Sequence, residues 1–121
     1  FMPPEGKLIS LQLRLQRAVR AFVDPELQQG KWTFESAKAF LVKEVGLSPA
    51  FATTEVERYT FRAPGQATSY WFGYSRLKQL RQDLEAKQGT RFDAMKFHDF
   101  VLAQGLLPPR LIREATLAEL K

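Results

Sequence analysis

The sequence contains no cysteine, and only one of its 121 residues is a histidine, His98. Without cysteine the chain has no disulfide framework, no thiol nucleophile and no thiolate zinc site. No apolar run approaches the ~18 residues that span a bilayer, and the opening FMPPEGKL lacks the basic and apolar regions of a signal peptide. We therefore expect no membrane-spanning segment in this chain.

Common catalytic motifs are absent as well. The sequence has no His-Glu-x-x-His, no Gly-rich phosphate loop and no Gly-x-Ser-x-Gly elbow. His98 lies in KFHDF, where the residues four positions away on a helix, Ala94 and Leu102, offer no carboxylate to orient the imidazole. We expect a structural or boundary position for His98, with no metal ligand and no catalytic residue in this chain.

The net charge of +5 comes from 18 basic and 13 acidic residues that are spread along the chain. A protein that binds nucleic acid usually gathers its basic residues on one face. Here Lys7, Arg14, Arg17 and Arg20 fall away from the main apolar stripe of the first helical segment, which predicts a solvated face. We expect no nucleic-acid partner.

Apolar residues recur at helical spacing along most of the chain. The first segment predicts a helix that ends near Asp24-Pro25, because proline disfavours helical geometry in the residue before it. Residues 25–32 are then expected to form a loop. The apolar stripe of this first helix consists of Leu8, Leu11, Leu15, Val19 and Phe22.

Capping signals delimit five further helices, because serine, threonine and aspartate begin helices, proline suits the first turn and glycine ends them. Strands are not expected, since the sequence has neither alternating segments nor Asn-Gly or Asp-Gly hairpin turns. The expected fold class is all-α, with about six helices in a single domain over residues 1–121. Thr33 begins and Gly46 ends the second helix, and Ser48-Pro49 begins a third that runs to about Arg62. The break at Pro64-Gly65 precedes a fourth helix over residues 66–87. Asp93 begins and Gly105 ends the fifth, and Pro108-Pro109 begins the last.

The helix expected after Pro64-Gly65 begins with turns that are apolar on all sides, which is typical of a helix buried on every side. Tyr70 and Gly73 are therefore expected to be buried or to face a concavity. The first helix also carries a second apolar strip, Ile9 and Leu13. Both features indicate surface that something outside this chain covers, so we expect a fragment of a longer protein.

Several motifs occur in a specific order. They are E-R-Y and P-G-Q-A-x-S-Y in EVERYTFRAPGQATSYWFGY, and F-D-x-x-x-F-H-D and G-x-L-P in LRQDLEAKQGTRFDAMKFHDFVLAQGLLPPRLI. With the upstream run LQLRLQRAVRAFVDPELQQGKWTFESAKAFL, nearly the whole chain resembles the C-terminal end of a bacterial family catalogued as domain of unknown function 885. Its members are several hundred residues long, mostly helical and often exported or lipid-anchored, which suggests the cell envelope or periplasm.

The resemblance implies a zincin-like metallopeptidase architecture, with zinc in the full-length protein. The family's zinc motif, His-Glu followed by Pro-Gly-His, lies upstream of the matched part and does not occur in this chain. By position in the matching motif, Arg58, Tyr59, Gln66 and Tyr70 are the substrate-binding candidates that line the cleft. Arginine suits a substrate carboxylate, and a tyrosine hydroxyl suits an oxyanion.

One position departs from the family's pattern. Many members read Asp-Thr-Gly-x-His where this chain reads Asp24-Pro25-Glu26-Leu27-Gln28, so Gln28 takes the place of the histidine. Any function of that histidine in metal binding or proton transfer is therefore lost here or belongs to a different subgroup.

The residues themselves also support plainer interpretations. Periodicity alone favours core packing for Tyr59, Tyr70 and Tyr74, and an ordinary surface ion pair between Glu55 and Arg58. Our leading hypothesis is the C-terminal helical region of a zinc-metallopeptidase-like hydrolase, not catalytic alone, whose partners are the rest of its own chain and a peptide or carboxylate ligand. The alternative is a stand-alone helical interaction module whose apolar surface binds a partner protein, or a second copy in a dimer.

Overall fold

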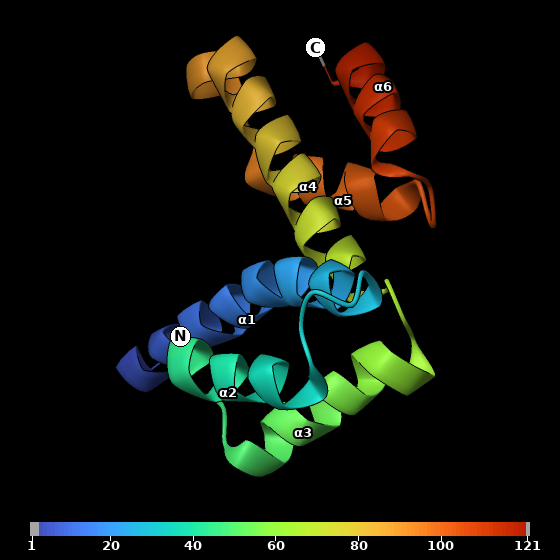
Figure 1. Ribbon diagram of the computed structural model, residues 1–121. Coiled ribbons are helices and arrows are strands. Elements are labelled where there is room, and N and C mark those ends of the chain that lie inside the picture. Colours follow the sequence, from blue (N-terminus) through green and yellow to red (C-terminus); the bar gives the residue numbers. More distant parts are fainter. Residues whose placement is uncertain (1–2, 121) are drawn as a thin grey trace. The chain divides into compact units, whose positions relative to one another are not determined.

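The structure is a computed structural model that describes residues 3–120. This part of the chain is helical and contains no strand (Figure 1). The all-α prediction is confirmed for these residues. A π-helical turn over Arg58–Arg62 continues the third helix, and a 3-10 turn over Gly89–Arg91 follows the fourth. The α-helices are α1 (Pro4–Gln28), α2 (Phe34–Val45), α3 (Pro49–Glu57), α4 (Ala67–Gln88), α5 (Ala94–Ala103) and α6 (Pro109–Glu119).

The chain divides into two compact units, unit 1 over Phe1–Phe72 and unit 2 over Gly73–Lys121. Unit 1 contains α1, α2, α3, the π turn and the first residues of α4, and unit 2 contains the rest of α4 with α5 and α6. Each unit has a hydrophobic core of its own. The single domain over residues 1–121 stays a prediction.

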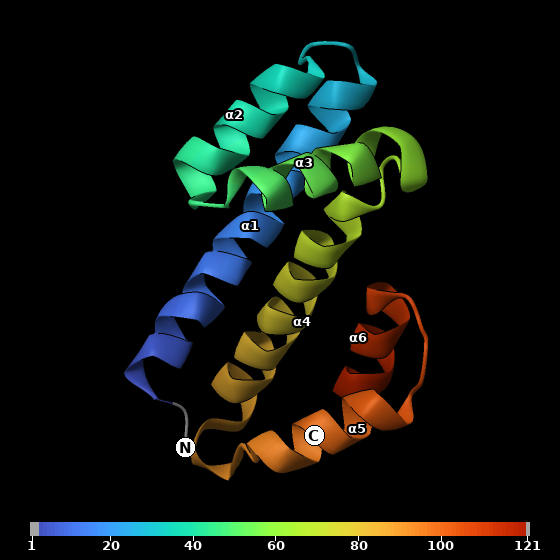
Figure 2. The same cartoon turned by 90° about the horizontal axis from the view of Figure 1, so that it is seen from below.

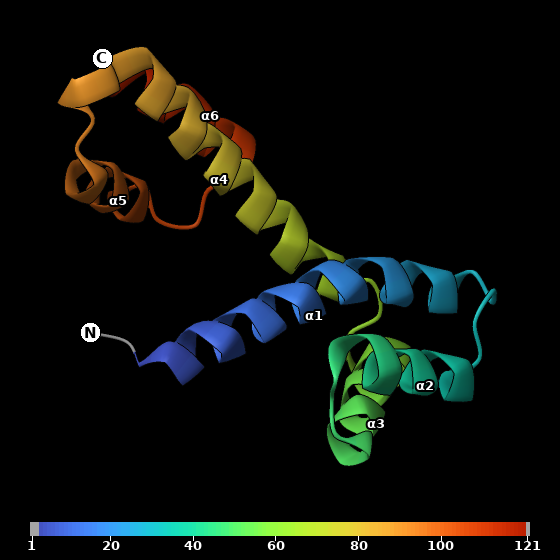
Figure 3. The same cartoon turned by 90° about the vertical axis from the view of Figure 1, so that its left-hand side faces the viewer.

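In unit 1, α2 and α3 pack on each other, and α2 and the π turn contact α1. Figures 2 and 3 show that the first turns of α1 project beyond α2 and α3. The core therefore lies against the C-terminal part of α1. Its buried apolar residues are Val23, Ala37, Leu41, Val45, Leu47, Ala52, Val56, Tyr59 and Ala67.

In unit 2, the core combines side chains from all three helices. Leu80 and Leu84 of α4 are buried with Phe97 of α5 and Ile112 of α6. An ion pair supplements these apolar contacts, since Nη1 of Arg113 on α6 donates to Oδ2 of Asp83 on α4 at 2.6 Å. The pKa of Asp83 is lowered most by the hydrogen bond from Gln79, and the hydrogen bond from Arg113 lowers it further.

The predicted helix ends are mostly confirmed, because they rest on local capping. Thr33 and Ser36 form a reciprocal capping box at the start of α2, and Gly46 ends that helix with a φ of 72°. The hydroxyl of Ser48 accepts the amide of Phe51 at 3.2 Å. The carboxylate of Asp93 accepts two amides at the start of α5.

The end of the first helix differs from the prediction. Instead of stopping near Asp24-Pro25, α1 continues to Gln28 with Pro25 inside it, so residues 25–28 are helical rather than a loop. Proline has no N–H and leaves the carbonyl four residues earlier without its helical donor. Tertiary hydrogen bonds offset this loss, since the side chains of Asp24 and Gln28 bind backbone groups of other elements.

The buried face of α1 follows the predicted apolar stripe only in part, since Val19 packs against the unit 1 core whereas the leucines do not. Leu8 is 70% exposed, and the other leucines of the stripe are exposed as well. Arg20, expected on a solvated face, is only 6% exposed and lies on the buried face with Gln16 and Asp24. The solvated face predicted for Arg20 is wrong because α1 meets the ends of other helices in unit 1, where free backbone groups need polar partners.

The break between α3 and α4 is confirmed, whereas complete burial of the first turns of α4 is wrong. Gly65 adopts a φ of +76° between the π turn and α4, which separates the two helices. Tyr70 is 40% exposed, and Phe72 is exposed too. A Cβ atom added at Gly73 would meet no heavy atom of the described chain within 4 Å, beyond the neighbours that every helix supplies. A larger residue at Gly73 is therefore not expected to overpack a core.

Candidate carboxylate-binding site

The site begins with the π turn that follows α3. The amide of Ala63 donates to the carbonyl of Arg58 at 2.8 Å, which is a bond across five residues rather than four. The carbonyl of Tyr59 thereby loses its α-helical donor, and the next residue, Pro64, has no N–H. The side-chain amide of Gln28 fills this place, donating to the Tyr59 carbonyl at 2.8 Å. Gln28 thus provides a donor that holds the π turn.

A buried carboxylate holds the turn that leads into α4. Asp24 is completely buried, and its two oxygens accept the amides of Gly65 at 2.9 Å and Ala67 at 3.0 Å. The first amides of a helix have no partner within the helix, and the helix dipole there favours a negative charge. Asp24 therefore anchors the residues that carry Gln66 and Tyr70.

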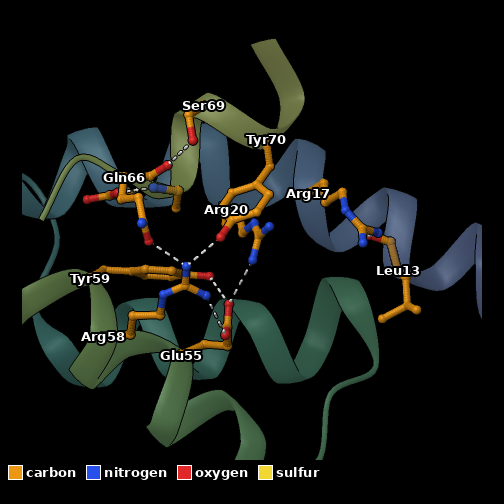
Figure 4. A network of polar contacts seen from close by, with 11 residues as sticks. Leu13, Arg17, Arg20, Glu55, Arg58, Tyr59, Gln66, Ser69 and Tyr70 are labelled. Carbon is orange, nitrogen blue, oxygen red and sulfur yellow. Dashed lines mark hydrogen bonds and ion pairs between the residues drawn. The ribbon is translucent and has the colours of Figure 1, made fainter. Parts of the chain in front are cut away.

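These two anchors bring three of the predicted residues together (Figure 4). Nη2 of Arg58 donates to Oε1 of Gln66 at 2.5 Å and to the hydroxyl of Tyr70 at 2.9 Å. The Arg58 side chain is 29% exposed, so its guanidinium can reach solvent. The hydrogen bond to Tyr70 raises the pKa of Arg58, which keeps this group positively charged.

Tyr59 occupies a different position from the other three candidates. Its side chain is buried in the core of unit 1, and its hydroxyl donates to Oε2 of Glu55 at 2.7 Å. Burial is the main cause that raises the pKa of Tyr59 well above its ordinary value, and this hydrogen bond raises it further. In this arrangement the Tyr59 hydroxyl is engaged by Glu55 and is not presented to a ligand.

Arg20 and Glu55 join the site, although sequence reasoning did not select them. Nη1 of Arg20 lies 3.6 Å from Oε2 of Glu55, and the Arg20 guanidinium carbon lies 3.9 Å from the centre of the Tyr70 ring. The expected ion pair of Glu55 with Arg58 is present at 3.8 Å, but Glu55 is buried rather than a surface group. The sequence offered one indication that Arg20 belongs to the site: it lies four residues before Asp24 and therefore on the same face of α1.

The cluster holds more positive than negative charge. Arg20 and Arg58 lie on either side of one carboxylate, that of Glu55, and both guanidinium groups lie near the ring of Tyr70. Nε of Arg20 is buried and has no hydrogen-bond partner among residues 3–120. Nε of Arg58 donates to no residue of this part of the chain either. A ligand carboxylate could accept from Arg58.

Metal-binding side chains are not grouped in the part of the chain that the structure describes. Among residues 3–120 no group of three or more His, Cys, Asp or Glu side chains is arranged to hold one. His98 is exposed on α5 and makes an edge contact with Phe97, with ring centres 5.2 Å apart. No helix within this described range is long and apolar enough to cross a bilayer.

A comparison with known protein families shows to which family the chain belongs. Residues 1–116 match the family described as "Bacterial protein of unknown function (DUF885)". The chain belongs to the DUF885 family. No curated protein and no solved structure matches it. Membership in DUF885 confirms the resemblance seen in the sequence, while the zincin-like architecture stays a prediction.

Proposed function

We propose that this DUF885 chain contributes a carboxylate-binding site to a hydrolase of the zinc-metallopeptidase type, and that the metal ligands lie outside these 121 residues. The ligand is a peptide or another molecule with a free carboxylate. The chain's own residues would bind and orient this ligand. No chemical step is assigned to a metal held by this chain, because residues 3–120 offer no suitable set of ligands.

The observation that carries this proposal is the guanidinium of Arg58. Gln66 and Tyr70 hold its Nη2 in place, while part of the side chain reaches solvent. A guanidinium that is held before binding loses little conformational freedom when it accepts a ligand. The planar, positively charged donor group of arginine favours a carboxylate.

The test compares two peptides that differ only in charge, N-acetyl-Ala-Ala and its C-terminal amide, by calorimetric titration of the 121-residue chain. We expect the acid to bind at least about tenfold more tightly, as hydrogen bonds to charged groups allow. Arg58→Ala should remove this preference, because it deletes both the positive charge and the N–H donors that a carboxylate would accept from. Arg62→Ala is the matched control, since Arg62 lies exposed in the same π turn.

Equal binding of the two peptides, or an acid preference that survives in Arg58→Ala, would contradict the proposal. A second arm measures peptide hydrolysis by a longer protein that contains this chain and the His-Glu and Pro-Gly-His motif. There, Arg58→Ala and Tyr70→Phe should lower turnover. Hydrolysis by the 121-residue chain alone would refute the assignment of the metal ligands to sequence outside it.

The exposed leucines of α1 favour the second candidate, a protein-interaction module. Leu8, Ile9, Leu11 and Leu15 are all exposed on the first turns of this helix. Exposed apolar groups that lie together mark surfaces that bind other proteins. Leu8→Ser with Leu11→Ser should then lower self-association in analytical ultracentrifugation and leave peptide binding unchanged. If the chain is a monomer before and after these changes, a dimer is excluded.

A further inference from the structure

Unit 2 contains a groove that takes no part in the carboxylate site of unit 1. Its volume is about 490 Å³, which lies within the usual range for small-molecule sites, roughly 300–1,000 Å³. One wall is a face of α4 from Tyr74 to Glu85, and the other is a face of α5 from Phe97 to Val101. All lining residues belong to unit 2, so the groove is complete within it.

The floor of the groove is apolar. Leu77 and Val101 pack at the edge of the unit 2 core, and Phe97 belongs to that core. Each of these residues also turns part of its surface into the groove. A floor of this kind binds the apolar part of a ligand by removing it from water.

The rim of the groove carries a surplus positive charge. Arg81 is neutralised by Glu85, with Nε of the arginine 2.9 Å from Oε1 of the glutamate. Lys78 is exposed and forms no ion pair within residues 3–120. His98 adds an exposed imidazole from α5. The one unpaired cation above an apolar floor favours a ligand with a single negative charge.

We propose that this groove binds a small carboxylic acid with an apolar or aromatic body. The body lies on Leu77, Phe97 and Val101, and the carboxylate lies beside Lys78. The site is separate from the cluster around Arg58 and does not depend on the function proposed for that cluster. A neutral molecule of the same shape keeps the apolar contact and loses the attraction to Lys78.

The test uses 3-phenylpropionate, its amide and acetate as probes, and the ring protons of His98 as the reporter. Because His98 is the chain's only histidine, its NMR signals are assigned without ambiguity. We expect 3-phenylpropionate to shift these signals saturably and the amide to bind about two- to fivefold more weakly, as a partly exposed ion pair allows. Acetate should produce no saturable shift, because it has no apolar body to occupy the floor.

Lys78→Ser should weaken 3-phenylpropionate to the level of the amide. Lys87→Ser is the matched control, because Lys87 is an exposed lysine on the same helix outside the groove. Circular dichroism confirms that both variants keep their helices. The proposal is overturned if 3-phenylpropionate gives no saturable shift, if acetate reproduces it, or if Lys78→Ser and Lys87→Ser bind equally well.

Discussion

Asp24 and Ala67 are 43 residues apart, and yet the carboxylate of the first accepts the backbone amide of the second at 3.0 Å. The same carboxylate accepts the amide of Gly65. This buried group ties the C-terminal part of α1 to the start of α4 within unit 1. It thereby positions Gln66 and Tyr70, the two residues that hold Arg58.

Replacing Asp24 with asparagine should destabilise the chain. The side-chain amide would oppose one of the two backbone amides, Gly65 or Ala67, with a donor instead of an acceptor. The free energy of unfolding should fall by about 1–3 kcal/mol, the usual effect of an unsatisfied buried group. Urea denaturation measures this loss. Asp99→Asn, at an exposed position of α5, is the control and should change little; equal effects of the two substitutions would contradict the prediction.

Gln28 provides a second test of how α1 supports the site. In Gln28→Leu the carbonyl of Tyr59 loses the side-chain donor at residue 28, and the free energy of unfolding should fall by about 1 kcal/mol. Histidine carries a ring N–H, so Gln28→His should retain more of the stability than Gln28→Leu. Gln29→Leu, at the exposed neighbouring residue, is the control in thermal denaturation. A histidine variant no more stable than the leucine variant would show that the hydrogen bond contributes little.

Tyr70 has two contacts that substitution can separate. Tyr70→Phe removes the hydroxyl that accepts from Arg58 but keeps the ring on which Arg20 lies. The expected loss of stability is about 0.5–1.5 kcal/mol, the net effect of one hydrogen bond. Tyr70→Ala also removes the contact with Arg20 and should cost about 0.5–2 kcal/mol more. Chemical denaturation of both variants gives the difference; equal losses would mean that the ring contact contributes nothing.

The chain should lose stability in alkali because of Tyr59. Its pKa is raised in the folded state, so the unfolded chain releases this proton at a lower pH. The contribution of Tyr59 is therefore fully present below about pH 10, the ordinary tyrosine value, and decreases as the pH rises above it. Denaturation at a series of pH values should show a shallower alkaline decline in Tyr59→Phe. The same slope in both proteins would contradict the assignment.

Two glycines offer a matched comparison of backbone strain. Gly65 has a φ of +76°, where a side chain is disfavoured, so Gly65→Ala should cost roughly 1–2 kcal/mol. Gly73 lies inside α4, and an added Cβ meets open space there. Gly73→Ala should thus stabilise the chain by up to about 1 kcal/mol through helix propensity. Thermal denaturation that shows the opposite signs would refute the conformations assigned to these residues.

Much of the helical framework could be predicted from the sequence because its causes are local. The ends at Thr33, Gly46, Ser48 and Asp93 depend on residues within one turn of each helix. The family resemblance selected Arg58, Gln66 and Tyr70, which the structure brings together. Neither local patterns nor the resemblance indicated what holds them in place.

Tertiary structure decided which face of α1 is buried and how the site is built. Along this helix Gln12, Gln16, Arg20, Asp24 and Gln28 recur at every fourth residue, and of these residues sequence reasoning had assigned Arg20 to a solvent-exposed face. Three of them bind backbone groups of unit 1 where helical bonding is incomplete: Gln12 at the end of α2, Asp24 at the start of α4 and Gln28 in the π turn. Hydrophobic periodicity assumes that the buried partner of a helix is apolar. Here the partners are free amides and carbonyls, and only folding places them against α1.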